Sequence, residues 1–393
     1  MDNRKFETKA IRIQLEKSPY KEHSVPLFET SSFIYNSAED ARAVFAEEQE
    51  GYIYSRFNNP NCDEFIQKLC ALEGTETGIA TSSGMAAIFL GIAGVLNAGD
   101  HIIASKSLFG TTHLLLNHVL PKWGISHTYA DMSDMKHVKE ALLPTTRLLY
   151  VETPSNPGLQ IFDLEKLGKF TNANDLYLVV DNCFATPYLQ MPVKYGVDFI
   201  VHSTTKYIDG QGRTIGGAIL GSSSLMKEII TLSRIIGPSM PASTGWLLSK
   251  SLETLAVRME RHCSNAFKLA EYLDNHKEVL WVKYPFLKTH PQYRLAKKQM
   301  TLGGGLVSFE LKGGMKRAMR FINSLHLFSI SSNLGDSRSI ITHPATTTHS
   351  KLTAEERKDA GITDAMVRVS VGLENITDLM EDTEQAITNS KNK

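Results

Sequence analysis

Between about residues 60 and 255, short apolar runs of strand length alternate with stretches of helical pattern, and this alternation limits the possible folds more than any other feature. Strands that alternate with helices favour a mostly parallel sheet covered on both faces. We therefore expect an α/β fold. The predicted strands are 77–81, 101–105, 148–152, 176–181 and 198–203, with helices predicted at 84–97 and 163–172.

The regions on either side have a different character. The first residues are polar and weakly periodic, typical of an arm that packs on a neighbouring subunit, with a short helix predicted at 37–48. Beyond Pro241 a long helical pattern, 245–276, leads to strands predicted at 305–311 and 365–371. We predict three parts, namely an N-terminal arm at 1–55, a large domain at 56–255 and a smaller α+β domain at 256–393.

Composition excludes several classes of protein. Lys plus Arg and Asp plus Glu both number 42, and this zero formal charge does not predict a nucleic-acid or anionic membrane partner. We see no signal-peptide core and no apolar run long enough to span a membrane. The cysteines form no C-x-x-C pair and are typical of reduced thiols, so we expect a cytoplasmic protein. They are Cys62, Cys70, Cys183 and Cys263.

Residues that directly follow the predicted strands form a consistent set, because ligands of open α/β sheets bind at the carboxyl ends of the strands. "SSGMAA" (82–87) begins a helix whose free N–H groups suit a phosphate. Asp181 ends another run, and "HSTTKY" (202–207) places Lys206 and hydroxyls after a third. Each feature alone is usually only structural. Together they predict a phosphate cradle, a carboxylate and an amine at one edge of the sheet.

These features fit pyridoxal 5′-phosphate, which needs a Schiff-base lysine, an acid at the pyridine nitrogen and a phosphate site. We predict that Lys206 attaches the cofactor and moves protons, and that Asp181 keeps the ring nitrogen protonated. Phe109 is placed to lay its ring on the cofactor face. The predicted phosphate ligands are Ser83, Gly84, Met85, Ser203 and Thr205.

Competing interpretations of the same residues fail on detail. Ser203 and Lys206 have the S-x-x-K spacing of acyl-transfer enzymes, but the S-D-N and K-T-G elements are missing from the sequence. "GQGRTIGG" (210–217) has its third glycine one position later than the dinucleotide fingerprint requires. His343 and His349 lack the context of a metal motif, so we predict no metal site.

One charge stands out near the C-terminus. Along "MVRVSV" (366–371) the valines alternate with Met366, Arg368 and Ser370, so Arg368 lies on the face opposite the valines. A solvent-facing strand arginine is equally compatible with this pattern. An amino-acid substrate, however, needs a bidentate partner for its carboxylate, which arginine supplies better than lysine.

With these residues in hand, the chain resembles the pyridoxal-phosphate transsulfuration enzymes of cysteine and methionine metabolism over nearly its whole length. The resemblance implies a fold-type I, aminotransferase-like architecture and a homotetramer of two tight dimers, with sites shared across the dimer interface. It also implies that Tyr54 and Arg56 reach the phosphate of the neighbouring subunit, and that Asn156, Ser332 and Arg368 hold the substrate carboxylate. The motifs that carry it are "YSRFNNPN" (54–61), "SSGMAA", "ETPSNP" (152–157), "DNCFATP" (181–187), "HSTTKY" and "VRVSVGLE" (367–374).

Details within the motifs indicate a branch of the family. Phe109 stands where most members have a tyrosine that is commonly given a proton-transfer role in the lyases. The strings "FGTT", "YIDGQGR" and "HPATTTH" resemble the sulfhydrylase branch. That branch implies γ-replacement on O-succinylhomoserine or O-acetylhomoserine by sulfide, giving homocysteine for methionine biosynthesis. Arg338, where cystathionine-processing relatives tend to have a glutamate, could favour an anionic acyl group or hydrosulfide.

Three alternatives stay open at this point. The chain could be a cystathionine γ-synthase, or a γ-lyase that acts on cystathionine or methionine. It could also be a protein that binds pyridoxal phosphate without catalysis, although Lys206, Asp181 and Arg368 argue against this class.

Overall fold

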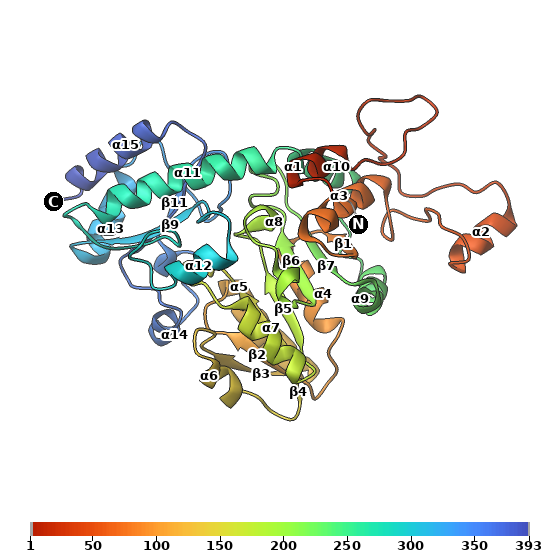
Figure 1. The fold of residues 1–393 in the computed structure, drawn as a ribbon, viewed down its shortest axis with the longest axis horizontal. Coiled ribbons are helices and arrows are strands. Elements are labelled where there is room, and N and C mark those ends of the chain that lie inside the picture. Colours follow the sequence, from red (N-terminus) through yellow and green to blue (C-terminus); the bar gives the residue numbers. More distant parts are fainter. Residues whose placement is uncertain (1–2, 392–393) are drawn as a thin grey trace.

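The computed structural model describes residues 3–391 and contains two β-sheets (Figure 1). The larger sheet has the strand order β1-β7-β6-β5-β4-β2-β3, and only β7 runs antiparallel to its neighbours. Its strands are β1 Thr77–Thr81, β2 His101–Ser105, β3 Ser126–Ala130, β4 Thr146–Glu152, β5 Tyr177–Asp181, β6 Phe199–Ser203 and β7 Gly217–Gly221.

The smaller sheet lies towards the C-terminal end of the chain and has the order β10-β11-β12-β9-β8. Most of its strand pairs are antiparallel, while β10 and β11 run parallel. Its strands are β8 Val279–Lys283, β9 Leu306–Leu311, β10 Ser329–Ile330, β11 Ile340–Thr342 and β12 Met366–Ser370. The fold is therefore α/β, with a mostly parallel large sheet and a second, smaller sheet.

Helices cover both faces of the large sheet, as the alternating pattern requires. One apolar core joins the sheet to α3, α7, α10 and the start of α11, and a second joins the opposite face to α4 and α9. The long helix α11 runs from the large sheet to the small one (Figure 1). The helices are α1 Phe6–Arg12, α2 Ala38–Phe45, α3 Pro60–Glu73, α4 Gly84–Ala93, α5 Gly110–Leu114, α6 Met135–Glu140, α7 Leu164–Ala173, α8 Thr186–Leu189, α9 Ser223–Ile236, α10 Ala242–Leu252, α11 Leu255–Asp274, α12 Tyr293–Gln299, α13 Gly314–Asn323, α14 Ala354–Asp359 and α15 Ile376–Asn389.

The five strands predicted for the large sheet are confirmed to within two residues. The single long helix predicted at 245–276 is wrong, because the chain leaves helical geometry at Thr254 (φ −110°, ψ 6°) and forms α10 and α11 instead. The structure also contains α3 and β7, which the sequence pattern did not predict. The division into parts at 55 and 255 stays a prediction.

The N-terminal segment is attached to the large sheet's helices at a few points and then extends away from them (Figure 1). The backbone N–H of Leu15 donates to Glu64, the indole of Trp246 donates to the carbonyl of Val25, and the backbone N–H of Phe28 donates to Asn61. Beyond these contacts Ile34 is 100% exposed. Tyr20, Leu27 and Phe45 of the same segment are exposed as well, so the segment presents several apolar side chains to solvent.

Three further observations concern the residues that the structure describes. All four cysteines are free and buried. Within residues 3–391, no helix is both long and apolar enough to cross a membrane. The same residues contain no group of histidine, cysteine and acidic side chains arranged to hold a metal ion.

Candidate active site

Lys206 lies three residues after the end of β6, in a position that is partly enclosed. Its Nζ donates a hydrogen bond to Oδ1 of Asn333 at 2.6 Å. Burial lowers the pKa of Lys206, and the nearby positive charge of Arg368 adds to this effect. Both causes favour the neutral amine, the form that can act as a nucleophile or a base. Asn333 was not among the predicted residues.

Asp181 ends β5 and is paired in register with Glu152 at the end of β4. Burial raises the pKa of Asp181 to about 6, although the backbone N–H of Cys183 and the charge of His202 act in the opposite direction. Burial and the adjacent charge of Asp181 raise the pKa of Glu152 well above its ordinary value. Burial and the proximity of the two carboxyl groups therefore favour the neutral form of Glu152, while the contacts of Asp181 with Cys183 and its pKa of about 6 favour its ionised form at neutral pH.

Phe109 is joined to this carboxylate pair through its backbone. Its N–H donates to Oε2 of Glu152 at 2.9 Å, and Phe109 precedes the first residue of α5. The side chain is half-buried and carries no hydroxyl group.

The predicted phosphate ligands converge where α4 begins beside the end of β6. Ser83 is the N-cap of α4, and its side chain accepts from the backbone N–H of Ala86. A Cβ atom on Gly84 would lie 2.6 Å from Cβ of Ser203, so only glycine allows this approach. The hydroxyl of Thr205 also lies here and contacts the backbone of Gly216.

Arg368 is almost completely enclosed, with 1% of its surface exposed, and the solvent-facing alternative is thereby wrong. Val367 and Val369 belong to the core of the small sheet, so the predicted alternation of faces is confirmed. One Nη donates to Oδ1 of Asn156 at 2.9 Å, and the other donates to the carbonyls of Ser332 and Asn333. Nε has no partner within the described chain.

Contacts therefore link Arg368, Asn156 and the Ser332–Asn333 segment to Lys206 as one cluster. Arg368 and Lys206 meet at Asn333, whose carbonyl and side-chain oxygens accept from them. Tyr54 and Arg56 make their contacts elsewhere in the chain. The guanidinium of Arg56 lies 4.6 Å from the ring centre of Phe57 and donates to the carbonyl of Arg234. Tyr54 is exposed.

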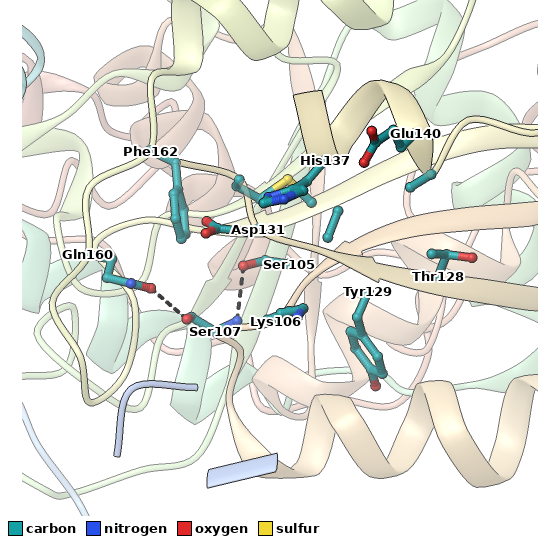
Figure 2. A pocket seen from close by; sticks show the side chains of 13 residues that line it. Ser105, Lys106, Ser107, Thr128, Tyr129, Asp131, His137, Glu140, Gln160 and Phe162 are labelled. Carbon is teal, nitrogen blue, oxygen red and sulfur yellow. Dashed lines mark hydrogen bonds between the residues drawn. The ribbon is translucent and has the colours of Figure 1, made fainter. Parts of the chain in front are cut away.

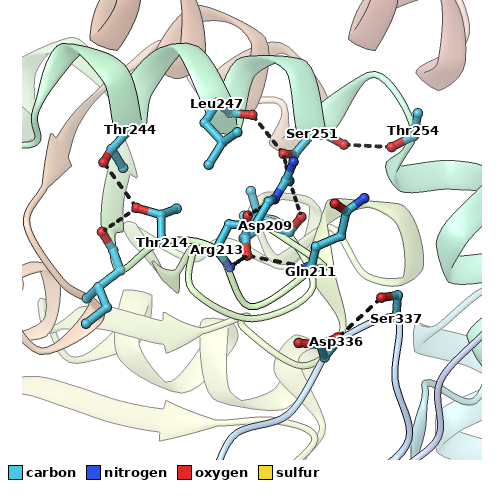
Figure 3. A network of polar contacts seen from close by, with 12 residues as sticks. Asp209, Gln211, Arg213, Thr214, Thr244, Leu247, Ser251, Thr254, Asp336 and Ser337 are labelled. Carbon is cyan, nitrogen blue, oxygen red and sulfur yellow. Dashed lines mark hydrogen bonds and ion pairs between the residues drawn. The ribbon is translucent and has the colours of Figure 1, made fainter.

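The segment that follows Lys206, with Asp209 and Gln211, lies beside the loop of Asp336 and Ser337 (Figure 3), and this loop also carries Asn333. Asp209 accepts from the backbone and side chain of Arg213, which itself donates to Ser251. The backbone N–H of Ser337 donates to the carbonyl of Gly210. The "YIDGQGR" string therefore builds the connection that holds Lys206 beside Asn333.

Arg338 belongs to the same connection. Its guanidinium pairs with Asp336 through two nitrogens at 2.9 Å, and it also donates to the carbonyl of Gln211. Its positive charge is offset by Asp336. These contacts indicate that Arg338 links its own loop to the loop of Gln211. They give no support to the hypothesis that Arg338 attracts an anion.

The two histidines of "HPATTTH" are buried. His343 contacts the hydroxyl of Thr346 and the carbonyl of Asp364. Burial lowers the pKa of His349 to about 4, and the charge of Arg368 contributes. Burial also lowers the pKa of His343, so both histidines favour the neutral form at neutral pH.

A separate cavity of about 540 Å³ lies at the ends of β2 and β3 (Figure 2). Ser107 donates to Oε1 of Gln160 at 2.6 Å on one side of it, and His137 and Glu140 lie on the other. The predicted cofactor and substrate ligands do not line this cavity. Two of the residues that line the cavity, Ser107 and Gln160, belong to the loops that carry Phe109 and Asn156.

A family model described as "Cys/Met metabolism PLP-dependent enzyme" matches residues 7–388. The chain belongs to this family. It is thus a pyridoxal-phosphate-dependent enzyme, as the strand-end residues predicted.

Curated relatives within the family have different activities. The chain is 45% identical to the L-methionine gamma-lyase of Fusobacterium nucleatum over 384 residues, which covers 97% of both chains. It is 43% identical to the O-succinylhomoserine sulfhydrylase of Pseudomonas aeruginosa over 377 residues, covering 96% of this chain and 94% of the relative.

Solved structures agree with the fold. A Campylobacter jejuni structure that contains a pyridoxyl-lysine phosphate group is 36% identical, with a TM-score of 0.94 and coverage of 98% of this chain and 99% of that one. The cystathionine gamma synthase of Xanthomonas oryzae in complex with cystathionine is 33% identical, with a TM-score of 0.95 and 99% coverage of both chains.

The residues present fit pyridoxal phosphate. The close approach at Gly84 leaves backbone N–H groups at the first turn of α4, which suit a phosphate. Asp181 offers the charged carboxylate for a pyridinium, and Lys206 offers the amine. Nε of Arg368, buried and without a partner, suits a substrate carboxylate.

Proposed function

We propose that this enzyme catalyses γ-replacement, in which sulfide displaces the acyloxy group of O-succinylhomoserine or O-acetylhomoserine to form homocysteine and free succinate or acetate. The C–O bond at Cγ breaks, and a C–S bond forms at the same carbon. Such a reaction supplies homocysteine for methionine biosynthesis.

The observation that carries this choice is Phe109. A lyase that releases a thiol benefits from an acid that protonates the departing sulfur. A carboxylate is a weak base and leaves without a proton. The ring of Phe109 cannot donate a proton, and its backbone N–H is engaged by Glu152. A phenyl ring at this position therefore matches an ester substrate better than a thioether.

The roles of the other residues follow from the cluster. Arg368 and Asn156 bind the substrate carboxylate, and Ser332 lies beside them. When bound, pyridoxal phosphate supplies an electron sink for the charge that develops at Cα. Asp181 holds the proton at the ring nitrogen by a charge-assisted hydrogen bond. Ser83, Gly84, Met85, Ser203 and Thr205 hold the phosphate.

Lys206 has two successive tasks in this proposal. Its amine would hold the cofactor in the resting enzyme and would be freed when the amino group of the substrate takes its place. Its Nζ then removes the proton from Cα and carries protons towards Cβ. Asn333 accepts a hydrogen bond from the released amine, which keeps Nζ within the cluster.

The N-terminal arm extends the proposal to the assembly. We propose a homotetramer of two dimers in which Tyr54 and Arg56 complete the phosphate site of the neighbouring subunit. The exposed Ile34 and Tyr54 support an arm with a partner surface. The free cysteines support a reducing compartment, and we propose the cytoplasm.

Steady-state assays test the function directly. The purified enzyme would be given O-succinylhomoserine, O-acetylhomoserine or methionine, each alone, with sulfide or with cysteine. We expect homocysteine from an ester plus sulfide to form at least about tenfold faster than 2-oxobutanoate forms from methionine. Faster release of 2-oxobutanoate from methionine would assign the enzyme to the γ-lyases, an activity that the Fusobacterium relative supports. A preference for cysteine over sulfide would assign it to cystathionine γ-synthesis.

The variant F109Y sharpens this test because it restores a phenol at the same backbone position. We expect F109Y to raise methionine cleavage relative to sulfide addition. An unchanged ratio of methionine cleavage to sulfide addition would show that Phe109 does not determine which reaction the enzyme catalyses. The variant F162Y, a buried ring outside the cluster, is the control for adding a hydroxyl group.

A further inference from the structure

Helix α11 runs from the large sheet to the small one (Figure 1), and three buried polar side chains lie on one of its faces. Arg258, His262 and Asn265 are spaced four and three residues apart, so they form a row along the helix (the α11 row). Their exposed fractions are 6%, 0% and 2%. Buried polar groups are costly unless they form hydrogen bonds, so the partners of the row show what it holds together.

Arg258 holds the turn that directly follows Lys206. One terminal nitrogen donates to the carbonyl of Tyr207 at 2.5 Å, and the other donates to the carbonyl of Ile208 at 3.2 Å. The second nitrogen also donates to the carbonyl of Ser251 at 2.9 Å, in the last turn of α10. One guanidinium therefore fastens the lysine turn to the junction of α10 and α11.

Two glycines show how closely this turn is packed. Gly210 has a φ of +73°, and a Cβ atom there would collide with the guanidinium of Arg258. A Cβ atom on Gly335, in the loop between β10 and β11, would lie 2.6 Å from the backbone nitrogen of Tyr207. The turn after Lys206 is therefore confined both by α11 and by a loop of the small sheet.

His262 and Asn265 hold the end of β12, the strand that contains Arg368. Nδ1 of His262 donates to the carbonyl of Val371 at 2.7 Å. The amide of Asn265 donates to the carbonyl of Gly372 at 3.0 Å. Val371 and Gly372 directly follow the strand, so these two bonds attach the strand end to α11.

The same helix thus contacts the Lys206 turn and, within its next two turns, the end of the Arg368 strand. In the proposed reaction Arg368 binds the substrate carboxylate and Lys206 removes the proton from Cα. The carboxylate carbon is bonded to Cα, so the distance between the two side chains decides whether this proton meets Nζ. A misplacement of about 1 Å in such a geometry slows a reaction about hundredfold.

We propose that Arg258, His262 and Asn265 are positioning residues that set the separation of Lys206 and Arg368, so that a substrate held by its carboxylate presents its Cα proton to Nζ. Arg258 fixes the lysine turn, and the other two fix the arginine strand. This inference rests on the proposed roles of Lys206 and Arg368. It is the same whether sulfide addition or methionine cleavage is the main reaction.

The test measures exchange of the Cα proton of L-norvaline with D₂O, by ¹H NMR, in the presence of holoenzyme. Norvaline has no leaving group at Cγ, so exchange reports proton removal and is independent of the later choice of reaction. The variants R258M and N265L keep a side chain of similar bulk but remove the donors. We expect each variant to slow exchange at saturating norvaline at least about tenfold.

Crystal structures of the variant holoenzymes give a second measurement that does not depend on turnover. The quantity compared is the distance between the Cα atoms of Lys206 and Arg368. We expect this distance to differ from wild type by at least about 0.5 Å in R258M and in N265L, which exceeds the tolerance of a working site. Slower exchange with an unchanged distance would overturn the inference.

Controls separate the α11 row from general damage and from the proposed site. K268M removes an exposed positive charge from the same helix and should exchange like wild type. R258K keeps a donor and should recover part of the rate. Wild-type exchange in folded R258M or folded N265L, with exchange lost in K206A, would overturn the role of the row alone.

Normal exchange in K206A would instead overturn the proposed role of Lys206. If R258M or N265L does not fold, the milder variants R258K and N265S decide the outcome. We expect these to exchange at least about threefold more slowly than wild type, and a rate equal to wild type would overturn the inference.

Discussion

Arg368 shows how a single buried charge organises the substrate end of the site. Its two terminal nitrogens are occupied by Asn156 and by carbonyls of the Ser332–Asn333 segment. Burial lowers the pKa of its guanidinium to about 10, which still leaves it charged at neutral pH. The planar group is held in place before substrate arrives, so little ordering is needed on binding.

Replacing this arginine by lysine keeps the charge but removes the planar donor set. We expect R368K to raise KM for the acylhomoserine about tenfold to hundredfold, with a smaller change in kcat, because lysine makes no bidentate contact. Steady-state kinetics would measure both constants. R147K, an exchange at an exposed arginine, is the matched control. An unchanged KM in R368K would remove Arg368 from substrate binding.

Single residues differed in how well the sequence revealed them. Asp181 and Lys206 each follow an apolar strand, so the end of the strand marked them. Asn333 gave no such signal, because it lies in a loop and its contact with Lys206 joins positions 127 residues apart. The sequence pattern did not determine whether Arg368 is buried either, because its partner Asn156 lies 212 residues away in the chain.

At the scale of elements, the start of α4 illustrates how packing defines a ligand site. Ser83 caps the helix, and the next residue touches the end of β6. The distance between these two elements is set by the missing side chain of Gly84.

We expect G84A to weaken pyridoxal phosphate binding at least about tenfold, because the added Cβ would meet Cβ of Ser203 at 2.6 Å and force the strand and helix apart. Fluorescence titration of the apoprotein would measure the dissociation constant. In G158A the new Cβ would lie no closer than 3.5 Å to any neighbour, so this variant should bind the cofactor like wild type. Equal affinity in G84A would show that α4 does not form the phosphate site.

A second connection between elements involves His290 and the loop that carries Asn156. Nδ1 of His290 accepts from the backbone N–H of Gln292, so Nε2 carries the proton and donates to the carbonyl of Leu159. Burial lowers the pKa of His290 to about 4. The folded protein therefore favours neutral His290, whereas the unfolded chain takes up a proton near pH 6.5.

The sign of the pH effect follows from this difference. The stability contributed by neutral His290 is complete above about pH 6.5 and is lost as the pH falls towards 4. We expect the free energy of unfolding to fall less between pH 7 and 4.5 in H290Q than in wild type, by about 2 kcal/mol. Urea unfolding at several pH values would measure it. Identical pH dependence in the two proteins would contradict the assignment.

The elements themselves were predictable where their pattern was simple. The parallel strands are continuous apolar runs, because both faces of the sheet are covered. The antiparallel β7 has the same length as β1 and β2, but it was missed because it has a glycine at each end. The pattern of α3 was hidden by buried polar residues such as Glu64 and Lys68, which pair only in the folded structure.

At the scale of the whole molecule, the arm is attached near Leu15 and Phe28 but otherwise extends beyond its own sheets (Figure 1). Tyr54, at the end of this arm, and Arg56, just beyond it, both contact Phe57, and Arg56 also donates to the carbonyl of Arg234. If sites are shared between subunits, Tyr54 and Arg56 of one subunit would serve the phosphate site of its neighbour, which is the role predicted for them.

A complementation experiment tests this arrangement. K206A and R56A should each have little activity, since one lacks the amine and the other the phosphate ligand. If sites are shared, co-refolding equal amounts creates mixed dimers in which one of two sites has neither lesion. We expect recovery of about a quarter of wild-type activity from random pairing. No recovery, with mixed dimers present, would show that Arg56 serves the site of its own chain.

The four buried cysteines have a practical consequence for assays that detect a released thiol. Burial raises the pKa of Cys62 and Cys263 to about 12 and that of Cys70 to about 11, and it raises the pKa of Cys183 well above its ordinary value. Their thiolate forms are therefore scarce at neutral pH, and thiolates are the forms that react with disulfide reagents. In assays without added sulfide or cysteine, such as methionine cleavage, a chromogenic disulfide could remain in the cuvette throughout turnover and report any small thiol as it is released, with the folded enzyme contributing almost no colour of its own.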